Sequence, residues 1–138
     1  MKRLLTAIAL LASISTAVAK DYTLSTPNTT IILSAEEGKQ LYFRYYGAKA
    51  TAADVRAAGR MLKYDAYPAF GTRCDAPYAS LVKQHDGDNA TKFVVDKVEQ
   101  SSGSPVSTLS FWLKDVAHPN LLVKVNYKAY NDCDVVKI

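Results

Sequence analysis

Ser107–Tyr130, STLSFWLKDVAHPNLLVKVNYKAY, is the stretch of this sequence that decides the fold class. Apolar and polar side chains alternate through both of its halves, Ser107–Asp115 and Leu121–Tyr130. The apolar members are Leu109, Phe111 and Leu113, followed by Val123, Val125, Tyr127 and Ala129. Because successive side chains of a strand point to opposite faces, this alternation predicts two strands that each bury one face. Val116–Asn120, which contains a proline, predicts the turn between them.

The same signals predict an earlier hairpin. Thr29–Leu33 is rich in β-branched and apolar residues, and Gln40–Tyr46 alternates. One face of this second strand is expected to hold Leu41, Phe43 and Tyr45. Between the two strands, Ala35–Lys39 reads as a turn in which Gly38 is free to adopt a positive φ.

Two further strands are predicted in the middle of the chain. Ala79–Gln84 and Thr91–Val98 flank Asp86–Asn89, whose Asp-Gly pair favours a tight turn. Short strands at this spacing predict an all-β fold, an antiparallel β-sandwich. Asp134–Ile138 reads as the beginning of one more strand, so we expect the sandwich to be incomplete in this chain.

Thr51–Leu62 is the one helical candidate. Thr51 and Asp54 have the spacing of a capping box, and apolar residues follow at helical intervals. Gly59 weakens a helix by about 1 kcal/mol relative to alanine. We therefore expect one or two helical turns inside a long connection.

The first 19 residues have the pattern of a signal peptide. Lys2 and Arg3 precede the apolar stretch Leu4–Val18, and Ala17–Ala19 has the small-x-small pattern of a cleavage site. The apolar stretch is shorter than the roughly 20 residues of a membrane-spanning helix. We expect cleavage before Lys20, a β-sandwich domain over residues 20–138, a periplasmic or secreted location, and no membrane association after cleavage.

The charge of the chain argues against nucleic acid as a partner. Removal of Lys2 and Arg3 with the signal lowers the net charge of +4 by two, and no long basic cluster remains. Export makes a disulfide between Cys74 and Cys133 chemically feasible, and two separate buried thiols are equally compatible with the sequence. Catalysis by cysteine is not favoured, because His85 and His118 have no motif around them.

The sequence contains only weak motifs for binding a metal or a cofactor. Asp86-x-Asp88 begins like a calcium loop, but Ala90 stands where a further ligand is needed. Closely spaced Cys or His pairs for zinc and a glycine-rich phosphate loop are absent from the sequence. Asp132 and Asp134 could form an acid pair, but a turn motif at a strand end is the favoured interpretation. We predict neither a metal nor a cofactor.

The most function-like segment is Tyr67–Asp88. It places aromatic residues, prolines, Arg73, Cys74 and Asp75 in one connection between strands, and loops are where a β scaffold usually carries function. A structural pair between Arg73 and Asp75 is the simpler interpretation of the charges. The many aromatic residues, Trp112 among them, favour core or interface packing over stacking on a sugar.

Several blocks of the sequence resemble the N-terminal domain of α-galactosidases of glycoside hydrolase family 36, in order and in spacing. The blocks are Pro27–Thr30, Gln40–Tyr42, Tyr67–Thr72 with Asp75, Pro77 and Ala79, Gln84–Gly87, Ser107–Leu113 and Val123–Val136. The series runs along nearly all of residues 20–138. Each block alone is short, and the specificity lies in the series.

The resemblance implies a β-supersandwich that precedes a catalytic (β/α)8 barrel and supports it. In this family the barrel supplies both catalytic aspartates for retaining hydrolysis of terminal α-galactosides. No barrel is present here, so no catalytic residue is assigned and the chain alone is expected to be inactive. The implied partners are that barrel, the galactoside substrate and a further copy in a homo-oligomer.

The resemblance also implies that the loop after Phe70 lies at the rim of the sugar pocket. Many relatives have a Gly-Asp-Phe-Arg-like segment there, whereas this chain has the shorter, reordered Thr72–Pro77, TRCDAP. The candidate rim residues are Phe70, Arg73, Asp75 and Tyr78. The alternative from a different class is a free-standing exported β-sandwich that binds carbohydrate or protein.

Overall fold

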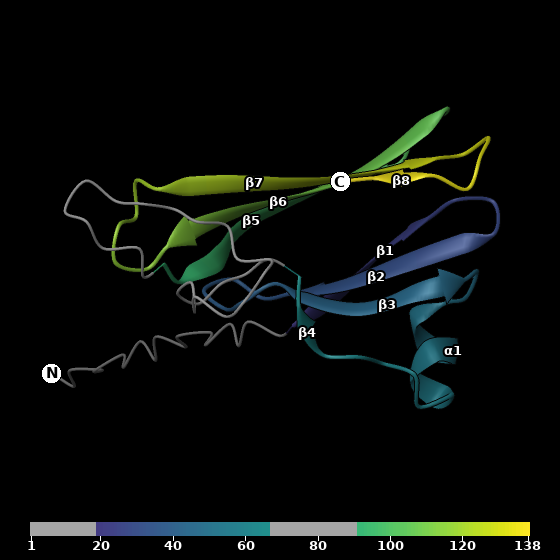
Figure 1. The fold of residues 1–138 in the computed structure, drawn as a ribbon, viewed down its shortest axis with the longest axis horizontal. Coiled ribbons are helices and arrows are strands. Elements are labelled where there is room, and N and C mark those ends of the chain that lie inside the picture. The colour runs from purple at the N-terminus through teal and green to yellow at the C-terminus, as the bar shows by residue number, and fades with distance from the viewer. Residues whose placement is uncertain (1–18, 67–90) are drawn as a thin grey trace, which may run out of the picture.

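The computed structural model describes residues 19–66 and 91–138, which form two stacked β-sheets with one short helix (Figure 1). The first sheet consists of β1 (Lys20–Ser25), β2 (Thr29–Ala35), β3 (Tyr42–Ala48) and β4 (Tyr64–Asp65). The second consists of β5 (Phe93–Ser101), β6 (Val106–Asp115), β7 (Leu122–Tyr130) and β8 (Val136–Lys137). The helix, α1, spans Ala52–Ala57. The predicted all-β antiparallel sandwich is confirmed.

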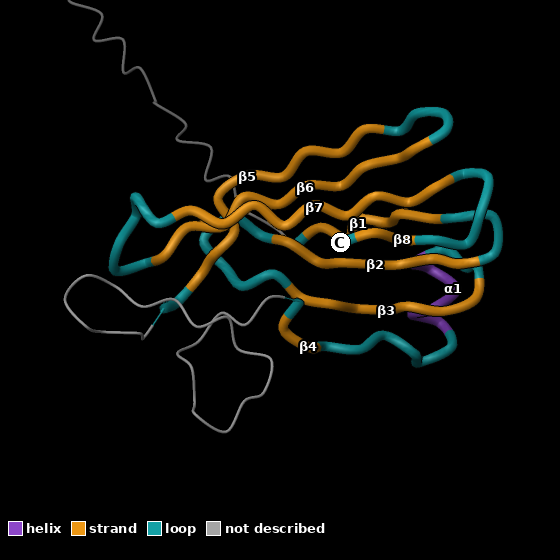
Figure 2. The backbone as a smooth tube through the Cα atoms, turned by 45° about the horizontal axis from the view of Figure 1, so that its top comes forward, coloured by secondary structure: helices purple, strands orange, loops and turns teal. Residues whose placement is uncertain are grey.

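Each sheet follows the order of the chain. Neighbouring strands are β1-β2-β3-β4 in one sheet and β5-β6-β7-β8 in the other, and every pair is antiparallel (Figure 2). This is a succession of antiparallel neighbours, which turns and loops can connect without crossovers. The predicted pair Ser107–Asp115 and Leu121–Tyr130 becomes β6 and β7, with Phe111 opposite Val125 in the register.

The core lies between the two sheets. Leu109, Phe111 and Leu113 are at most 1% exposed, as their alternation predicted. Edge-to-face contacts place the Phe111 ring 5.8 Å from that of Tyr22 in the other sheet and 6.1 Å from that of Tyr127. Such aromatic pairs add stabilisation to the burial of apolar area.

The alternation predicted for Gln40–Tyr46 is wrong beyond Phe43. The register of β2 and β3 shifts between Ile32 and Leu33, so Phe43 lies opposite Leu33 whereas Tyr45 lies opposite Ile32. Consecutive residues of a strand face opposite sides of a sheet. Phe43 and Tyr45 therefore do not share a face, because a β-bulge adds one residue between them.

The helix has six residues, fewer than two turns, so the expected length within Thr51–Leu62 is confirmed, and it begins where predicted. The Thr51 side chain accepts the N–H of Asp54, and the Asp54 carboxylate accepts the N–H of Thr51, which confirms the capping box. Gly59, with a φ of 65°, follows the last turn. The helix lies under the first sheet, on the side away from the second sheet (Figure 1), and buries Val55.

Two strand boundaries differ from the predictions. Lys20–Ser25 forms β1, although its alternation of apolar and polar residues is too short to predict a strand. Of the predicted strand start Asp134–Ile138, only two residues form a strand, β8. The predicted strand Ala79–Gln84 lies outside the described residues. No helix in the described part of the chain has the length and apolar character needed to cross a bilayer.

Candidate functional site

The residues proposed for the sugar-pocket rim, Phe70, Arg73, Asp75 and Tyr78, lie outside the described residues, as does most of the signal segment. Their roles stay predictions. Cys133 is exposed, so a buried thiol at this position is wrong. Its pairing with Cys74 stays a prediction, because Cys74 also lies outside the described part of the chain.

The residues that flank the Tyr67–Asp88 segment are held by one turn. On the near side, the N–H of Ala66 donates to the carbonyl of Leu41 at 2.9 Å. On the far side, the N–H of Val95 donates to the carbonyl of Lys39 at 2.8 Å, and Val95 in turn accepts the N–H of Gly38 at 2.9 Å. The β2–β3 turn thus bonds to Ala66, directly after β4 of the first sheet, and to Val95 in β5 of the second sheet.

A pocket of about 600 Å³ opens beside that turn, on the outer face of the first sheet. The strand register sets Asp21, Ser34 and Tyr42 in a row across β1, β2 and β3. Most of the other lining residues come from the β2–β3 turn, the bulge of β3, the helix α1 and the connection before β4. The remaining lining residues are Ala19, Ala35, Glu36, Lys39, Gln40, Arg44, Arg56 and Lys63.

The pocket carries an excess of positive charge. Its lining holds four cationic and two acidic side chains, and the Arg56 guanidinium is paired with Asp21. The ammonium of Lys63 lies 4.9 Å from the centre of the Tyr42 ring, and the Tyr42 hydroxyl donates to Gln40 at 3.1 Å. The Nε of Arg44 is buried and has no hydrogen-bond partner among the described residues.

At another part of the molecule, Asp134 ties the two sheets together. Its carboxylate accepts the Thr26 hydroxyl at 2.8 Å, the Asn28 N–H at 2.8 Å and the Asn28 side-chain amide at 2.7 Å. These bonds from Asn28 and Thr26, with the charge of Lys49, lower the pKa of Asp134. The carboxylate therefore serves a turn, as the favoured interpretation of the Asp132-x-Asp134 pattern predicted.

A second structural carboxylate, Asp115, was missed by the sequence analysis. It is fully buried and accepts the N–H of Lys92 at 2.6 Å, the N–H of His118 at 2.8 Å and the His118 ring at 3.1 Å. Burial acts to raise the pKa of Asp115, but these bonds outweigh it and the pKa is lowered. The sequence signal that could have indicated this role is the His118-Pro119 turn, which begins three residues after Asp115.

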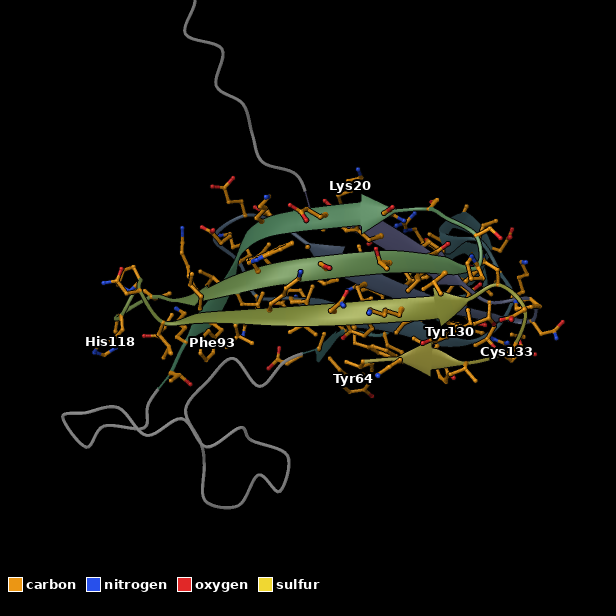
Figure 3. The ribbon with its side chains drawn as sticks, turned by 90° about the horizontal axis from the view of Figure 1, so that it is seen from above. Lys20, Tyr64, Phe93, His118, Tyr130 and Cys133 are labelled. Atoms are coloured by element: carbon orange, nitrogen blue, oxygen red, sulfur yellow. The ribbon has the colours of Figure 1, made fainter. Side chains whose placement is uncertain are left out.

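The two carboxylates lie near opposite ends of the sandwich. Figure 3 shows His118, which binds Asp115, at one end and Cys133, which precedes Asp134, at the other. Between them, on the outer face of the second sheet, Trp112 lies below two ammonium groups. Lys97 and Lys124 stand 5.2 and 4.3 Å from the ring centre.

Comparison with known proteins adds no relative. No family model matches this chain, and no curated protein does. Within residues 19–66 and 91–138, no three His, Cys, Asp or Glu side chains cluster in a way that could hold a metal ion. The function therefore has to be argued from the sandwich and its surface.

Proposed function

We propose that this sandwich is the non-catalytic N-terminal part of an exported α-galactosidase-like glycoside hydrolase. It would support a catalytic barrel and frame the barrel's pocket for terminal α-galactosides. The series of sequence blocks that resembles family 36 is the first support. The β-sandwich class of the fold is compatible with the supersandwich that the resemblance implies.

The observation that carries the proposal is the attachment of both flanks of Tyr67–Asp88 to one turn. Ala66 binds Leu41 and Val95 binds Lys39, so both flanks of the segment are bonded to the same short stretch of backbone. Functional loops are commonly positioned by a rigid scaffold of this kind. This arrangement suits a loop that contributes to the rim of a neighbouring pocket.

Six of the described carboxylates make structural contacts, which favours a non-catalytic role. Asp134 and Asp115 bind backbone N–H groups, and Asp54 caps α1. Asp21, Asp96 and Glu99 pair with Arg56, Lys114 and Lys97. A retaining glycosidase needs two carboxyl groups about 5 Å apart and free to reach the sugar. We therefore assign the hydrolysis to the barrel.

Two experiments test the proposal, an α-galactosidase assay of the purified chain and sequencing of the DNA downstream of its coding region. The purified chain should release no chromophore from an aryl α-galactoside, and the DNA that follows the Ile138 codon should encode a (β/α)8 barrel in frame or just past a frameshift. Turnover by the chain itself would contradict the assignment of catalysis to the barrel. A native stop codon with no barrel sequence nearby would contradict the family assignment.

One observation favours the alternative of a carbohydrate- or protein-binding module. Trp112 is the one tryptophan of the chain and lies on a sheet face, where an aromatic ring can meet a ligand. Its fluorescence reports on this face alone. Quenching by soluble oligosaccharides that is absent with buffer, together with calorimetric binding that is lost in W112A, would favour the module.

A further inference from the structure

The pocket on the outer face of the first sheet is large enough for a small organic ligand. Its volume of about 600 Å³ falls within the range of about 300–1,000 Å³ that such sites have. Its residues come from β1, β2, β3, the β2–β3 turn, α1 and the connection before β4. The site thus combines residues that are far apart in the sequence.

The charges of the pocket are only partly compensated within the molecule. Arg56 is paired with Asp21, but in the described part of the chain no ion pair joins Lys39, Arg44 or Lys63 to a carboxylate. Glu36 is the one acidic lining residue left to balance these three cations. The pocket is therefore suited to a ligand with negative charge.

Arg44 is the one cation of the lining that is half-buried, whereas Lys39, Arg56 and Lys63 are exposed. Its Nε is buried and makes no hydrogen bond to any residue of 19–66 or 91–138, and buried polar groups in proteins nearly always have a partner. A guanidinium presents paired N–H donors that match the two oxygens of a carboxylate. Arg44 occupies the bulge of β3, so a backbone irregularity sets this side chain against the pocket.

The rest of the lining has the character of a sugar site. Tyr42 provides an aromatic ring, and Gln40 and Ser34 provide neutral hydrogen-bonding groups. Sugar hydroxyls use such groups, and the pocket is larger than a single inorganic oxyanion would fill. We propose that this pocket binds an acidic monosaccharide unit, a hexuronate, with its carboxylate on Arg44.

The inference does not depend on the α-galactosidase proposal, because the site belongs to this chain alone. It is tested by titrating the purified protein with galacturonate and with galactose while recording amide and tyrosine NMR signals. The two sugars differ at C6, so their difference isolates the carboxylate. Galacturonate should shift signals of Tyr42 and Ser34 with an affinity roughly tenfold above that of galactose.

Two variants separate the site from the fold. R44Q and K63Q should each weaken galacturonate binding, R44Q by roughly tenfold to a hundredfold, because a charge-assisted bond is lost. R60Q is the matched control: Arg60 is exposed, follows the same helix and does not line the pocket. It should bind galacturonate as the parent does. Thermal unfolding of each variant shows whether the fold is kept.

Inorganic phosphate distinguishes a sugar-acid site from a simple oxyanion site. If phosphate shifts the same signals with an affinity equal to that of galacturonate, the sugar assignment is overturned. Equal binding of galactose and galacturonate overturns the role of the carboxylate. Unchanged galacturonate binding by both folded variants, R44Q and K63Q, overturns the location of the site.

Discussion

The carboxylate of Asp134 holds Asn28 at both of its donors, with the backbone N–H at 2.8 Å and the side-chain amide at 2.7 Å. The two residues lie 106 positions apart in the chain, one in the turn before β2 of the first sheet and the other before β8 of the second. These bonds therefore fix two turns, and through them the two sheets, to each other.

We predict that D134N lowers the thermal unfolding temperature. An asparagine has nearly the same shape, but it exchanges one acceptor oxygen for a donor that faces Asn28, and the charge-assisted bonds are lost. D132N is the matched control, because Asp132 is the neighbouring acid of the same turn and makes no hydrogen bond to Asn28 or Thr26. Differential scanning calorimetry at neutral pH measures both. Equal unfolding temperatures for the two variants would contradict the role of Asp134.

The Asp134 bonds should also make stability depend on pH. The pKa of Asp134 is lowered from its ordinary value of 3.8, so the folded state binds this proton less readily than the unfolded state. The stabilisation is fully present above the ordinary pKa and is lost as the pH falls through the lowered one. The difference in unfolding temperature between the parent and D134N should therefore shrink below about pH 4. A constant difference down to pH 2 would argue against it.

Replacement of Asp115 is expected to lower the free energy of unfolding strongly. Its carboxylate is fully buried, and D115A removes the acceptor of the Lys92 and His118 N–H groups. A buried donor left without its acceptor costs about 1–3 kcal/mol, so the free energy of unfolding in urea should fall by at least that amount. D96A is the control, since Asp96 pairs with Lys114 at the surface and its loss should have a much smaller effect.

Phe111 tests the core that the sequence predicted. F111A should lower the free energy of unfolding by about 3–5 kcal/mol, because it removes a fully buried ring and its edge-to-face contacts. V116A, at a side chain that is 53% exposed, should change it little. A loss below about 1 kcal/mol for F111A, measured by urea unfolding, would place the core elsewhere.

Gly38 tests the turn that joins the two sheets. It has a φ of 74°, and a methyl group at this position would meet no other atom within 4 Å, so conformation alone decides the cost of G38A. An L-residue in this left-handed region costs about 1–2 kcal/mol. Amide hydrogen exchange at Val95, whose N–H and carbonyl both bind this turn, should accelerate in G38A more than exchange at Tyr127. Equal acceleration at both amides would mean that the turn does not act locally.

Local signals of the sequence predicted much of the fold. Alternation located β6 and β7 because a sheet with one buried face requires a period of two, and Thr51 with Asp54 located the start of α1 because a capping box is confined to four residues. The bulge at Arg44 could not be predicted from such local signals. It depends on the partner strand, and the alternation of Gln40–Tyr46 gives no sign of it.

The candidate sites needed long-range information. The pocket combines Asp21, Ser34 and Tyr42, which are separated in sequence and adjacent only through the strand register. Asp115 looked like the last residue of a strand, and its importance comes from Lys92, 23 positions earlier. Contacts of this kind follow from the assembled sheets and leave no local pattern in the sequence.

The bond between Asn28 and Asp134 has a consequence for the order of folding. During synthesis the first sheet emerges well before Asp134, so its opening turn lacks this partner until β5, β6 and β7 have also left the ribosome. Contacts at such sequence separation cost chain entropy to form, and folds rich in them fold slowly. For an exported protein, as we propose this chain to be, that delay is an advantage. A chain threaded through a membrane must stay unfolded, and this sandwich can close fully only after Asp134 has followed.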